Sequence, residues 1–279
     1  MSAFEIFNQV PARETLVMGV LNVTPDSFSD GGQHLAVDAA VSHARQMVAD
    51  GAHVIDVGGE SSRPGAAPLT PAEEQERVLP VLERLAEEQI PVSIDTYHAD
   101  TARRAVALGV CMINDITALR GDPAMAEVAG ESGRACVLMH MLGTPRTMQQ
   151  DPRYDDVIDD ICRFFEERIR FATRFGIREE NIWLDPGFGF GKSAAHNLEV
   201  LRRLAEFKRF GRRILIGTSN KSTIGAVLNV PVDERTEGTA ATVAIGIANG
   251  ADAIRVHDVK RMTRVARMTD AIVRGKFND

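Results

Sequence analysis

The sequence is poor in residues that mark several common classes of protein. Its 279 residues include only three cysteines and one tryptophan, and aromatic residues make up 5%. Cys111, Cys136 and Cys162 are odd in number and lack the spacing of metal ligands, and no histidine belongs to an HExxH pattern. We therefore expect no structural zinc site. Buried free thiols are predicted at Cys111 and Cys136, which fits the reducing cytoplasm.

Long apolar runs and an excess of positive charge are also missing. No stretch is long enough to span a membrane, and residues 1–14 lack the charged start and apolar run of a signal peptide. The formal net charge of −7 repels nucleic acid, phosphate and acidic lipid. We predict a cytoplasmic protein without a nucleic-acid or membrane partner. Any anionic substrate must be bound by a local cluster of cations and backbone N–H groups.

Short apolar runs alternate with amphipathic helical stretches along the whole chain. In residues 37–50, for example, Val37, Val41, Ala44 and Val48 lie on one predicted helix face. Eight runs, each followed by a helical stretch, predict a (β/α)₈ TIM barrel, with a doubly wound open sheet as the alternative. We expect a single domain over residues 1–279 with a short N-terminal extension of about residues 1–14. The predicted strands cover residues 16–21, 54–57, 92–95, 112–114, 135–139, 182–185, 214–218 and 253–256.

An internal repeat supports the barrel. Residues 49–57 read ADGAHVIDV, residues 248–256 read ANGADAIRV, and residues 107–115, ALGVCMIND, share the Gly and the Ile four positions later. The Gly suits the left-handed residue that ends a helix. The residue after the shared Ile is Asp56, Asn114 or Arg255, on strands 2, 4 and 8. Alternate strands of a barrel supply one inward-facing layer, in which Asp185 of strand 6 would be the fourth member.

Polar residues follow every predicted strand. The longest connections cover residues 22–36, 58–70 and 141–153, and in this architecture such loops form the catalytic face. Asp and Asn also cap helices and loops, which is the alternative interpretation for any one of them. The polar strand ends are Asn22, Asp56, Asp95, Asn114 with Asp115, His140, Asp185, Thr218 and Arg255 with His257.

Two of these strand ends could bind an anion. Arg255 and His257 are two residues apart on a strand and share a face, so beside Asn22 they could grip a phosphate. The alternative is a packed histidine next to a salt-bridged arginine. Lys221 opens a helix after strand 7, where Ser222 and free backbone N–H groups suit a carboxylate or phosphate, although Ser219 could simply cap that helix.

Residues 187–193, GFGFGKS, look like a phosphate-binding loop but do not match one. The spacing is one residue short of G-x-x-x-x-G-K-[ST], and Pro186 occupies the position of the first Gly. Trp183, which alternates with Asp185 on the same strand, is expected to pack in the core or wall.

Eight segments together resemble one family, dihydropteroate synthase of the folate pathway. They run across nearly the whole chain in the order and spacing of that family, and jointly they are highly specific. The segments are MGVLNVTPDSFSDGG (18–32), DVGGESSRPGA (56–66), SIDTYHA (93–99), INDI (113–116), LMHMLGTPRTMQ (138–149), LDPGFGFGK (184–192), IGTSNKSTIG (216–225) and RVHDVKRM (255–262).

The resemblance implies a transferase that is the target of sulfonamides and forms a homodimer. Such an enzyme joins 4-aminobenzoate to 6-hydroxymethyl-7,8-dihydropterin pyrophosphate, releases pyrophosphate and uses Mg²⁺. The resemblance assigns catalysis to Asp95, Lys221, Arg255 and His257, and metal contacts to Asn22 and Asp30. It assigns pterin binding to Asp95, Asn114, Asp185 and Lys221, pyrophosphate binding to Asn22, Ser62, Arg255 and His257, and aminobenzoate binding to Phe28, Ser62, Arg63, Pro64, Phe190 and Ser222.

Two positions depart from the pattern of the family. Ser62 stands where Thr is common, and the hydroxyl is kept. Asn220 stands where the family commonly has Arg, so one cation at the rim is missing. Three alternatives stay open: a pterin-binding methyltransferase that serves a corrinoid protein, a paralogue that binds pterin without turnover, and a barrel for a sugar phosphate. The grip of Asn22, Arg255 and His257 argues against the first, and the density of Asp and Asn argues against the last.

Overall fold

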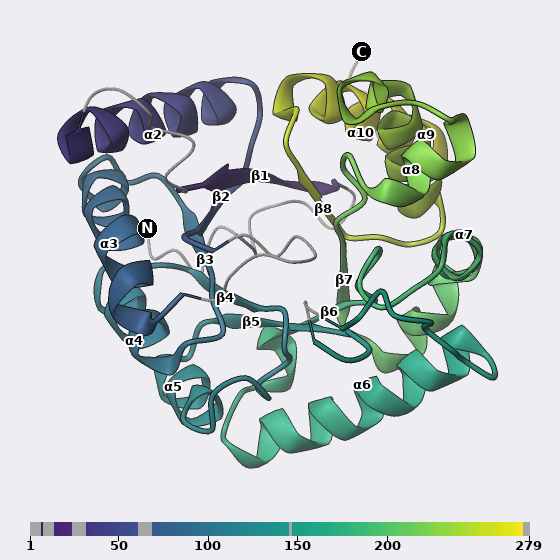
Figure 1. Ribbon diagram of the computed structural model, residues 1–279, viewed down its shortest axis with the longest axis horizontal. Helices are drawn as coiled ribbons and strands as arrows, with labels where there is room; N and C mark the ends of the chain where they lie inside the picture. Colours follow the sequence, from purple (N-terminus) through teal and green to yellow (C-terminus); the bar gives the residue numbers. More distant parts are fainter. Residues whose placement is uncertain (1–6, 8–13, 24–31, 61–68, 145–146, 276–279) are drawn as a thin grey trace.

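The chain folds into a closed parallel barrel surrounded by helices. The structure is a computed structural model that describes residues 7, 14–23, 32–60, 69–144 and 147–275, with the backbone alone at 32–34. Each strand pairs with the next in sequence, and β8 pairs with β1. Figure 1 shows α2 to α10 following one another around the strands. Closure confirms the predicted TIM barrel and excludes the open sheet. The single domain over residues 1–279 stays a prediction, because Phe7 is the only residue of 1–13 that the structure describes.

Short strands alternate with longer helices, as the apolar pattern predicted. The strands are β1 (Leu16–Asn22), β2 (Val54–Gly58), β3 (Val92–Asp95), β4 (Met112–Asp115), β5 (Ala135–Met139), β6 (Ile182–Asp185), β7 (Arg213–Ile216) and β8 (Ala253–Val256). The helices are α2 (Gly32–Ala49), α3 (Pro71–Glu87), α4 (Ala99–Ala107), α5 (Met125–Ser132), α6 (Val157–Arg174), α7 (Ala194–Arg202), α8 (Ser222–Leu228), α9 (Thr236–Ala248) and α10 (Val259–Arg274).

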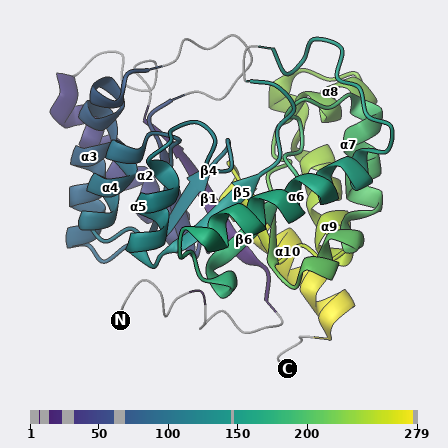
Figure 2. The ribbon, with the colours of Figure 1, turned by 90° about the horizontal axis from the view of Figure 1, so that it is seen from below.

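Two apolar layers hold the barrel together. Inward-facing side chains at the amino ends of the strands form an inner cluster, in which the Trp183 ring meets Phe7 edge-on at 5.3 Å. Trp183 is therefore a core residue, as predicted. Outward-facing strand residues pack against the helices in a larger cluster. Figure 2, seen from the side, shows the strands enclosed between α2–α5 and α6–α10. The apolar inner cluster leaves the carboxyl ends of the strands for polar groups.

The internal repeat corresponds to a helix end followed by a strand. Gly51, Gly109 and Gly250 have φ angles of +106°, +94° and +103°, in the left-handed region that an L side chain rarely adopts. Each glycine turns the chain into the next strand within a few residues. The repeated register is thus set by the same turn on three sides of the barrel.

Two details of the sequence prediction are wrong. Strand β7 covers Arg213–Ile216, so Thr218 lies beyond its end. On α2, Val48 is 38% exposed, and Met47 takes its place against the core at 2% exposure. Both positions are compatible with helical spacing, and packing against the neighbouring elements selects Met47.

The three cysteines are free and buried, as predicted for Cys111 and Cys136. Among the helices in the described ranges, none combines the length and apolar character that a bilayer crossing requires.

Candidate active site

Three of the four residues of the polar layer predicted from the repeat, Asp56, Asn114 and Arg255, form one hydrogen-bonded network at the barrel mouth. Asp56 on β2 is fully buried, and its Oδ2 atom accepts from Asn114 Nδ2 at 3.0 Å and from Arg255 Nε at 2.6 Å. These residues come from β2, β4 and β8, which bring them together although 199 positions separate Asp56 from Arg255. Because Asn114 donates through its amide nitrogen, its carbonyl oxygen is left to accept a bond from a ligand.

Asp95 is the second carboxylate partner of Arg255. It lies at the end of β3, and its Oδ2 accepts from Arg255 Nη2 at 2.7 Å. Burial raises the pKa of Asp95 to about 7, although the Arg255 guanidinium opposes this rise. Burial lowers the pKa of Arg255, but Asp56 and Asp95 outweigh it and leave that pKa above its ordinary value. Two of the five N–H groups of Arg255 serve these carboxylates, and three others can serve phosphate oxygens.

Asp185 lies at the end of β6, in the register that faces the barrel interior. Its Oδ1 accepts from the backbone N–H of Gly187 at 2.7 Å, and the side chain is buried. Burial raises the pKa of this carboxyl to about 6, with the Gly187 N–H and the cations Lys221, Lys192 and Arg255 opposing. The positive φ of Gly187 lets the loop pass close to His140. Asp185 forms no hydrogen bond with the Asp56 network, but the charge of Arg255 in that network acts on it.

Lys221 is the N-cap residue of α8 and faces the Phe190 ring, whose centroid lies 4.2 Å from its Nζ atom. Burial lowers the pKa of Lys221 to about 8, an effect that Arg255 reinforces and Asp185 and Asp95 oppose. Ser222 begins the helix with an exposed side chain. A cation, an aromatic wall and a helix N-terminus therefore meet on one side of the mouth.

His257 and Asn22 lie at the outer edge of the mouth. The His257 Nδ1 atom is 3.0 Å from Ser219 Oγ, and both His257 and Asn22 are exposed. The alternative of a packed histidine is therefore wrong, whereas a salt-bridged Arg255 is correct. Ser219 does not cap α8, because its hydroxyl is held by His257 rather than by the helix.

Several predicted site residues lie outside the described part of the chain, namely Phe28, Asp30, Ser62, Arg63 and Pro64. Within that part, no group of three or more His, Cys, Asp or Glu side chains could hold a metal ion.

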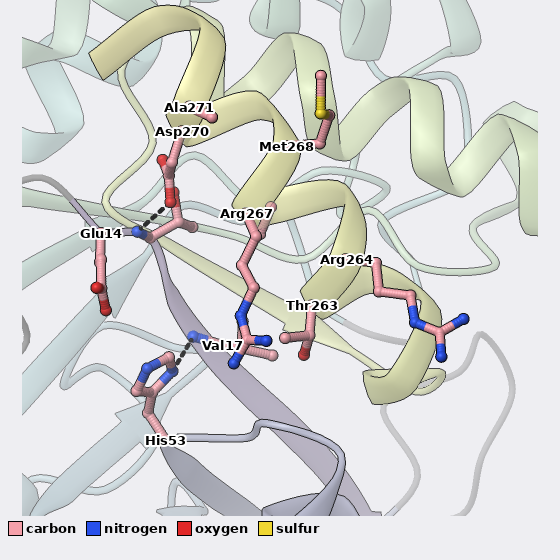
Figure 3. Close-up of a pocket in the computed structure, with 11 residues that line it drawn as sticks. Glu14, Val17, His53, Thr263, Arg264, Arg267, Met268, Asp270 and Ala271 are labelled. Carbon is pink, nitrogen blue, oxygen red and sulfur yellow. Dashed lines mark hydrogen bonds between the residues drawn. The ribbon is translucent and has the colours of Figure 1, made fainter. Parts of the chain in front are cut away.

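A pocket of about 600 Å³ lies at the opposite end of the barrel, between α10 and the residues just before β1 and β2 (Figure 3). Some of its polar groups bind one another. Asp270 accepts from both the backbone N–H and the hydroxyl of Thr15, and His53 Nδ1 accepts from the backbone N–H of Val17. These bonds join α10 to the strands, so the pocket marks a structural junction away from the polar mouth.

Comparisons with known proteins show the family of the chain. The family described as pterin-binding enzyme matches residues 18–257. A dihydropteroate synthase of Bacillus subtilis is 48% identical over 93% of this chain and 89% of its own length. The chain belongs to the dihydropteroate synthase family of pterin-binding enzymes.

Solved structures of the same family share the fold. That of the Clostridium difficile enzyme in the presence of pteroic acid is 50% identical, covers 94% of this chain and 97% of that one, and has a TM-score of 0.88. That of the Yersinia pestis enzyme with a sulfonamide drug is 45% identical, covers 94% and 95%, and has a TM-score of 0.89. The family and fold implied by the sequence motifs are thus confirmed.

Sequence reasoning gave no role to several residues that shape the site. The repeat predicts that Asp56 belongs to the polar layer but gives it no function. Its alignment with Asn114 and Arg255 in the repeat is the signal that could have indicated one. Lys192 belongs to the segment that resembles a phosphate-binding loop, and the sequence predicts no role for it, yet its side chain is buried. Asp115 is a loop anchor, because its carboxylate accepts from the backbone N–H groups of Thr117 and Leu119.

Proposed function

We propose that the barrel mouth carries out dihydropteroate synthesis, with the pterin deep in the barrel and 4-aminobenzoate above it. The reaction follows from the family. The chain is a transferase of folate biosynthesis that joins 6-hydroxymethyl-7,8-dihydropterin pyrophosphate to 4-aminobenzoate and releases pyrophosphate. The observation that carries the residue roles is the network in which Asp56 joins Asn114 to Arg255. It supports the proposal because it joins the side chain assigned to the pterin, Asn114, to one assigned to the pyrophosphate, Arg255.

The pterin is held by Asp185, Asn114, Lys221 and Asp95. Its amino-pyrimidinone edge has adjacent N–H donors, which a buried carboxylate such as Asp185 can accept in pairs. The Asn114 amide oxygen, left over by its bond to Asp56, accepts another donor. Lys221 donates to a ring oxygen or nitrogen.

The pyrophosphate is held by Asn22, Arg255 and His257, together with Ser62. The fit of Mg²⁺ rests on donor chemistry: Asn22 ends β1 exposed and has an amide oxygen, a hard ligand that Mg²⁺ accepts alongside substrate phosphate oxygens. Asn22 would hold the ion, with Asp30 as a second contact. When bound, Mg²⁺ supplies charge neutralisation at the leaving group.

The aminobenzoate is bound where α8 begins. Its carboxylate meets Ser222 and the free backbone N–H groups of the helix start, and its ring lies near Phe190, with Phe28, Ser62, Arg63 and Pro64 completing the pocket. A sulfonamide has a comparable arylamine shape, so we propose that it competes for the same place, as a sulfonamide is present in the structure of the Yersinia pestis enzyme.

The chemistry needs no strong base. The bond from the methylene carbon of the pterin to the pyrophosphate oxygen breaks first. The arylamine, which is neutral and nucleophilic at pH 7, then bonds to that carbon through its nitrogen and loses one proton to solvent. Arg255 and His257 stabilise the charge that grows on the leaving oxygen. The electron-rich dihydropterin shares positive charge with the methylene, and the carboxylates of Asp95 and Asp185 stabilise that charge. We therefore expect a dissociative displacement.

A homodimer and a cytoplasmic location complete the proposal. The helices α7, α8 and α9 are neighbours (Figure 1). They carry exposed apolar side chains, namely Leu198 on α7, Val227 and Leu228 on α8, and Ile245 on α9. Such side chains suit association of two copies. Buried free cysteines are compatible with the cytoplasm.

One assay tests the function. Purified protein, Mg²⁺, the pterin pyrophosphate and 4-aminobenzoate should yield dihydropteroate and equimolar pyrophosphate. Tight pterin binding without product would instead identify a paralogue that has lost its chemistry. Neither binding nor product would contradict the proposal as a whole.

A further inference from the structure

The buried ammonium of Lys192 is the feature that the proposed reaction leaves unused. The side chain is 2% exposed, and its Nζ atom lies 2.9 Å from His140 Nδ1, 2.9 Å from the Gly187 carbonyl oxygen and 3.1 Å from that of Phe190. No carboxylate within the described ranges forms an ion pair with Lys192. Three acceptors match the three N–H bonds of an ammonium group. A buried cation held only by neutral acceptors is costly, so its position calls for a physical reason.

The two carbonyls that Lys192 binds belong to the residues that place the pterin contacts. Gly187 donates its N–H to the Asp185 carboxylate at 2.7 Å. Phe190 presents its ring to Lys221 at 4.2 Å. Lys192 therefore binds the loop after β6 at two points. Gly187 contacts Asp185, and Phe190 contacts Lys221.

Other side chains hold the same loop at different points. Tyr154 donates its hydroxyl to the Gly191 carbonyl at 2.7 Å, and Gln149 donates to that of Gly189 at 2.7 Å. Neither of them forms a hydrogen bond with Gly187 or Phe190. Tyr154 is therefore a matched control, since it makes one hydrogen bond to the loop without touching the residues beside Asp185 and Lys221.

We propose that Lys192 is a positioning residue for the pterin, whose ammonium fixes the peptide groups of Gly187 and Phe190 so that Asp185 and Lys221 meet the ring. The inference rests on the proposed function. It predicts that Lys192 affects binding of the pterin ring but not of the pyrophosphate. Arg255 is held by Asp56 and His257 by Ser219, so neither contact depends on Lys192.

The charge of Lys192 also acts on Asp185. Lys192, Lys221 and Arg255 all lower the pKa of that carboxyl, which burial raises to about 6. Burial lowers the pKa of Lys192 to about 7, with Asp185 opposing and Lys221 reinforcing the shift. His140, the third neighbour, has a pKa well below its ordinary value through burial and the charges of Lys192 and Arg120, so it is neutral. The protonated form of Lys192 thus favours the ionised form of Asp185.

The test compares Lys192→Met with Tyr154→Phe by calorimetry, using 6-hydroxymethyl-7,8-dihydropterin and its pyrophosphate ester. Lys192→Met should weaken both ligands about tenfold or more and by the same factor, because the ring contacts are shared. Tyr154→Phe should change either affinity by less than about threefold. A lower melting temperature with unchanged pterin affinity would make Lys192 merely structural and would overturn the proposal.

A pH profile adds a readout that a structural role does not move. Pterin binding should weaken as Asp185 becomes protonated, and Lys192→Met should shift this acid limb to higher pH, because a cation that lowers the pKa of Asp185 is gone. An unshifted limb would contradict the electrostatic part of the proposal.

A milder variant covers the case in which Lys192→Met does not fold. His140→Leu leaves Lys192 with two acceptors, and it should weaken both pterin ligands by a smaller equal factor. Unchanged affinity in this folded variant would also overturn the proposal. Asp185→Asn separates the two levels: if it too leaves pterin affinity unchanged, the proposed function fails, and if only the Lys192 variants do, the inference fails alone.

Discussion

At the scale of single residues, we assign different partners to the two oxygens of the Asp185 carboxylate. Its Oδ1 atom accepts from Gly187, and we assign the other oxygen to the pterin. In Asp185→Asn the amide oxygen can keep the loop bond, so an N–H₂ donor then faces the donors of the pterin. An unpaired buried polar group costs about 1–3 kcal/mol, so pterin affinity should fall about tenfold or more with the fold retained. Calorimetry that shows unchanged affinity would refute the role.

The backbone explains the residue at position 220. Asn220 has a φ of +57°, in the left-handed region where Asn is better tolerated than most L residues. A cation is also already close, since Arg235 Nη1 donates to the Asn220 carbonyl at 2.8 Å. The sequence suggests that position 220 is exposed at the rim, but Asn220 is half-buried. The departure from the family thus has a conformational reason.

We therefore expect Asn220→Arg to change activity little. The protein should be active as it stands, and kcat/KM should rise by no more than about tenfold, since a screened charge contributes about 1 kcal/mol or less. The gain should shrink in high salt, and the strained backbone should lower the free energy of unfolding by about 1 kcal/mol. Steady-state kinetics at two ionic strengths and denaturant melts measure both effects. An inactive natural protein that Arg restores fully would overturn the assignment.

At the scale of elements, Arg255 on β8 and His257 just beyond it are held in different ways. Arg255 on the strand is tied to Asp56 and Asp95, whereas His257, just beyond its end, is exposed and held by Ser219. The strand therefore carries a rigid cation inside and an accessible imidazole at the edge. Ser219, in turn, is committed to β8 rather than to α8, which begins at Ser222 without a side-chain cap.

This arrangement predicts a selective effect for His257→Ala. Binding of the pyrophosphorylated pterin should weaken by roughly tenfold, because one charge-assisted contact is lost, while binding of the bare hydroxymethyl pterin should not change. Titrations of both ligands against both proteins provide the comparison. Equal losses for the two ligands would contradict a pyrophosphate contact at His257.

At the scale of the whole molecule, depth in the barrel sets the order of binding. Asn114 and Asp185 are buried at 4% and 6% exposure, whereas Ser222 is exposed at the start of α8. The proposed pterin site is thus more deeply buried than the proposed aminobenzoate site. Pterin pyrophosphate with Mg²⁺ should raise the melting temperature, and 4-aminobenzoate alone should not. Comparable stabilisation by 4-aminobenzoate alone would argue against this order.

Sequence by itself determined the barrel and the membership of its polar layer. The alternation of apolar runs with helical stretches needs only local periodicity, and the repeat placed Asp56, Asn114 and Arg255 in one register because the same glycine turn precedes each strand. The eight motifs then indicated the family. Each of these signals lies within a short stretch of chain, so it can be recognised without knowing which distant residues contact that stretch.

Only the tertiary structure decided which polar groups bind one another. Asp56 and Arg255 are 199 positions apart, and closure of β8 onto β1 brings them to 2.6 Å. Likewise, the sequence around Lys192 resembles a phosphate loop, but the fold turns its ammonium inward onto His140, which is 52 positions away. Hydrogen bonds are made through space, and local pattern carries no information on which distant acceptor a buried donor will meet.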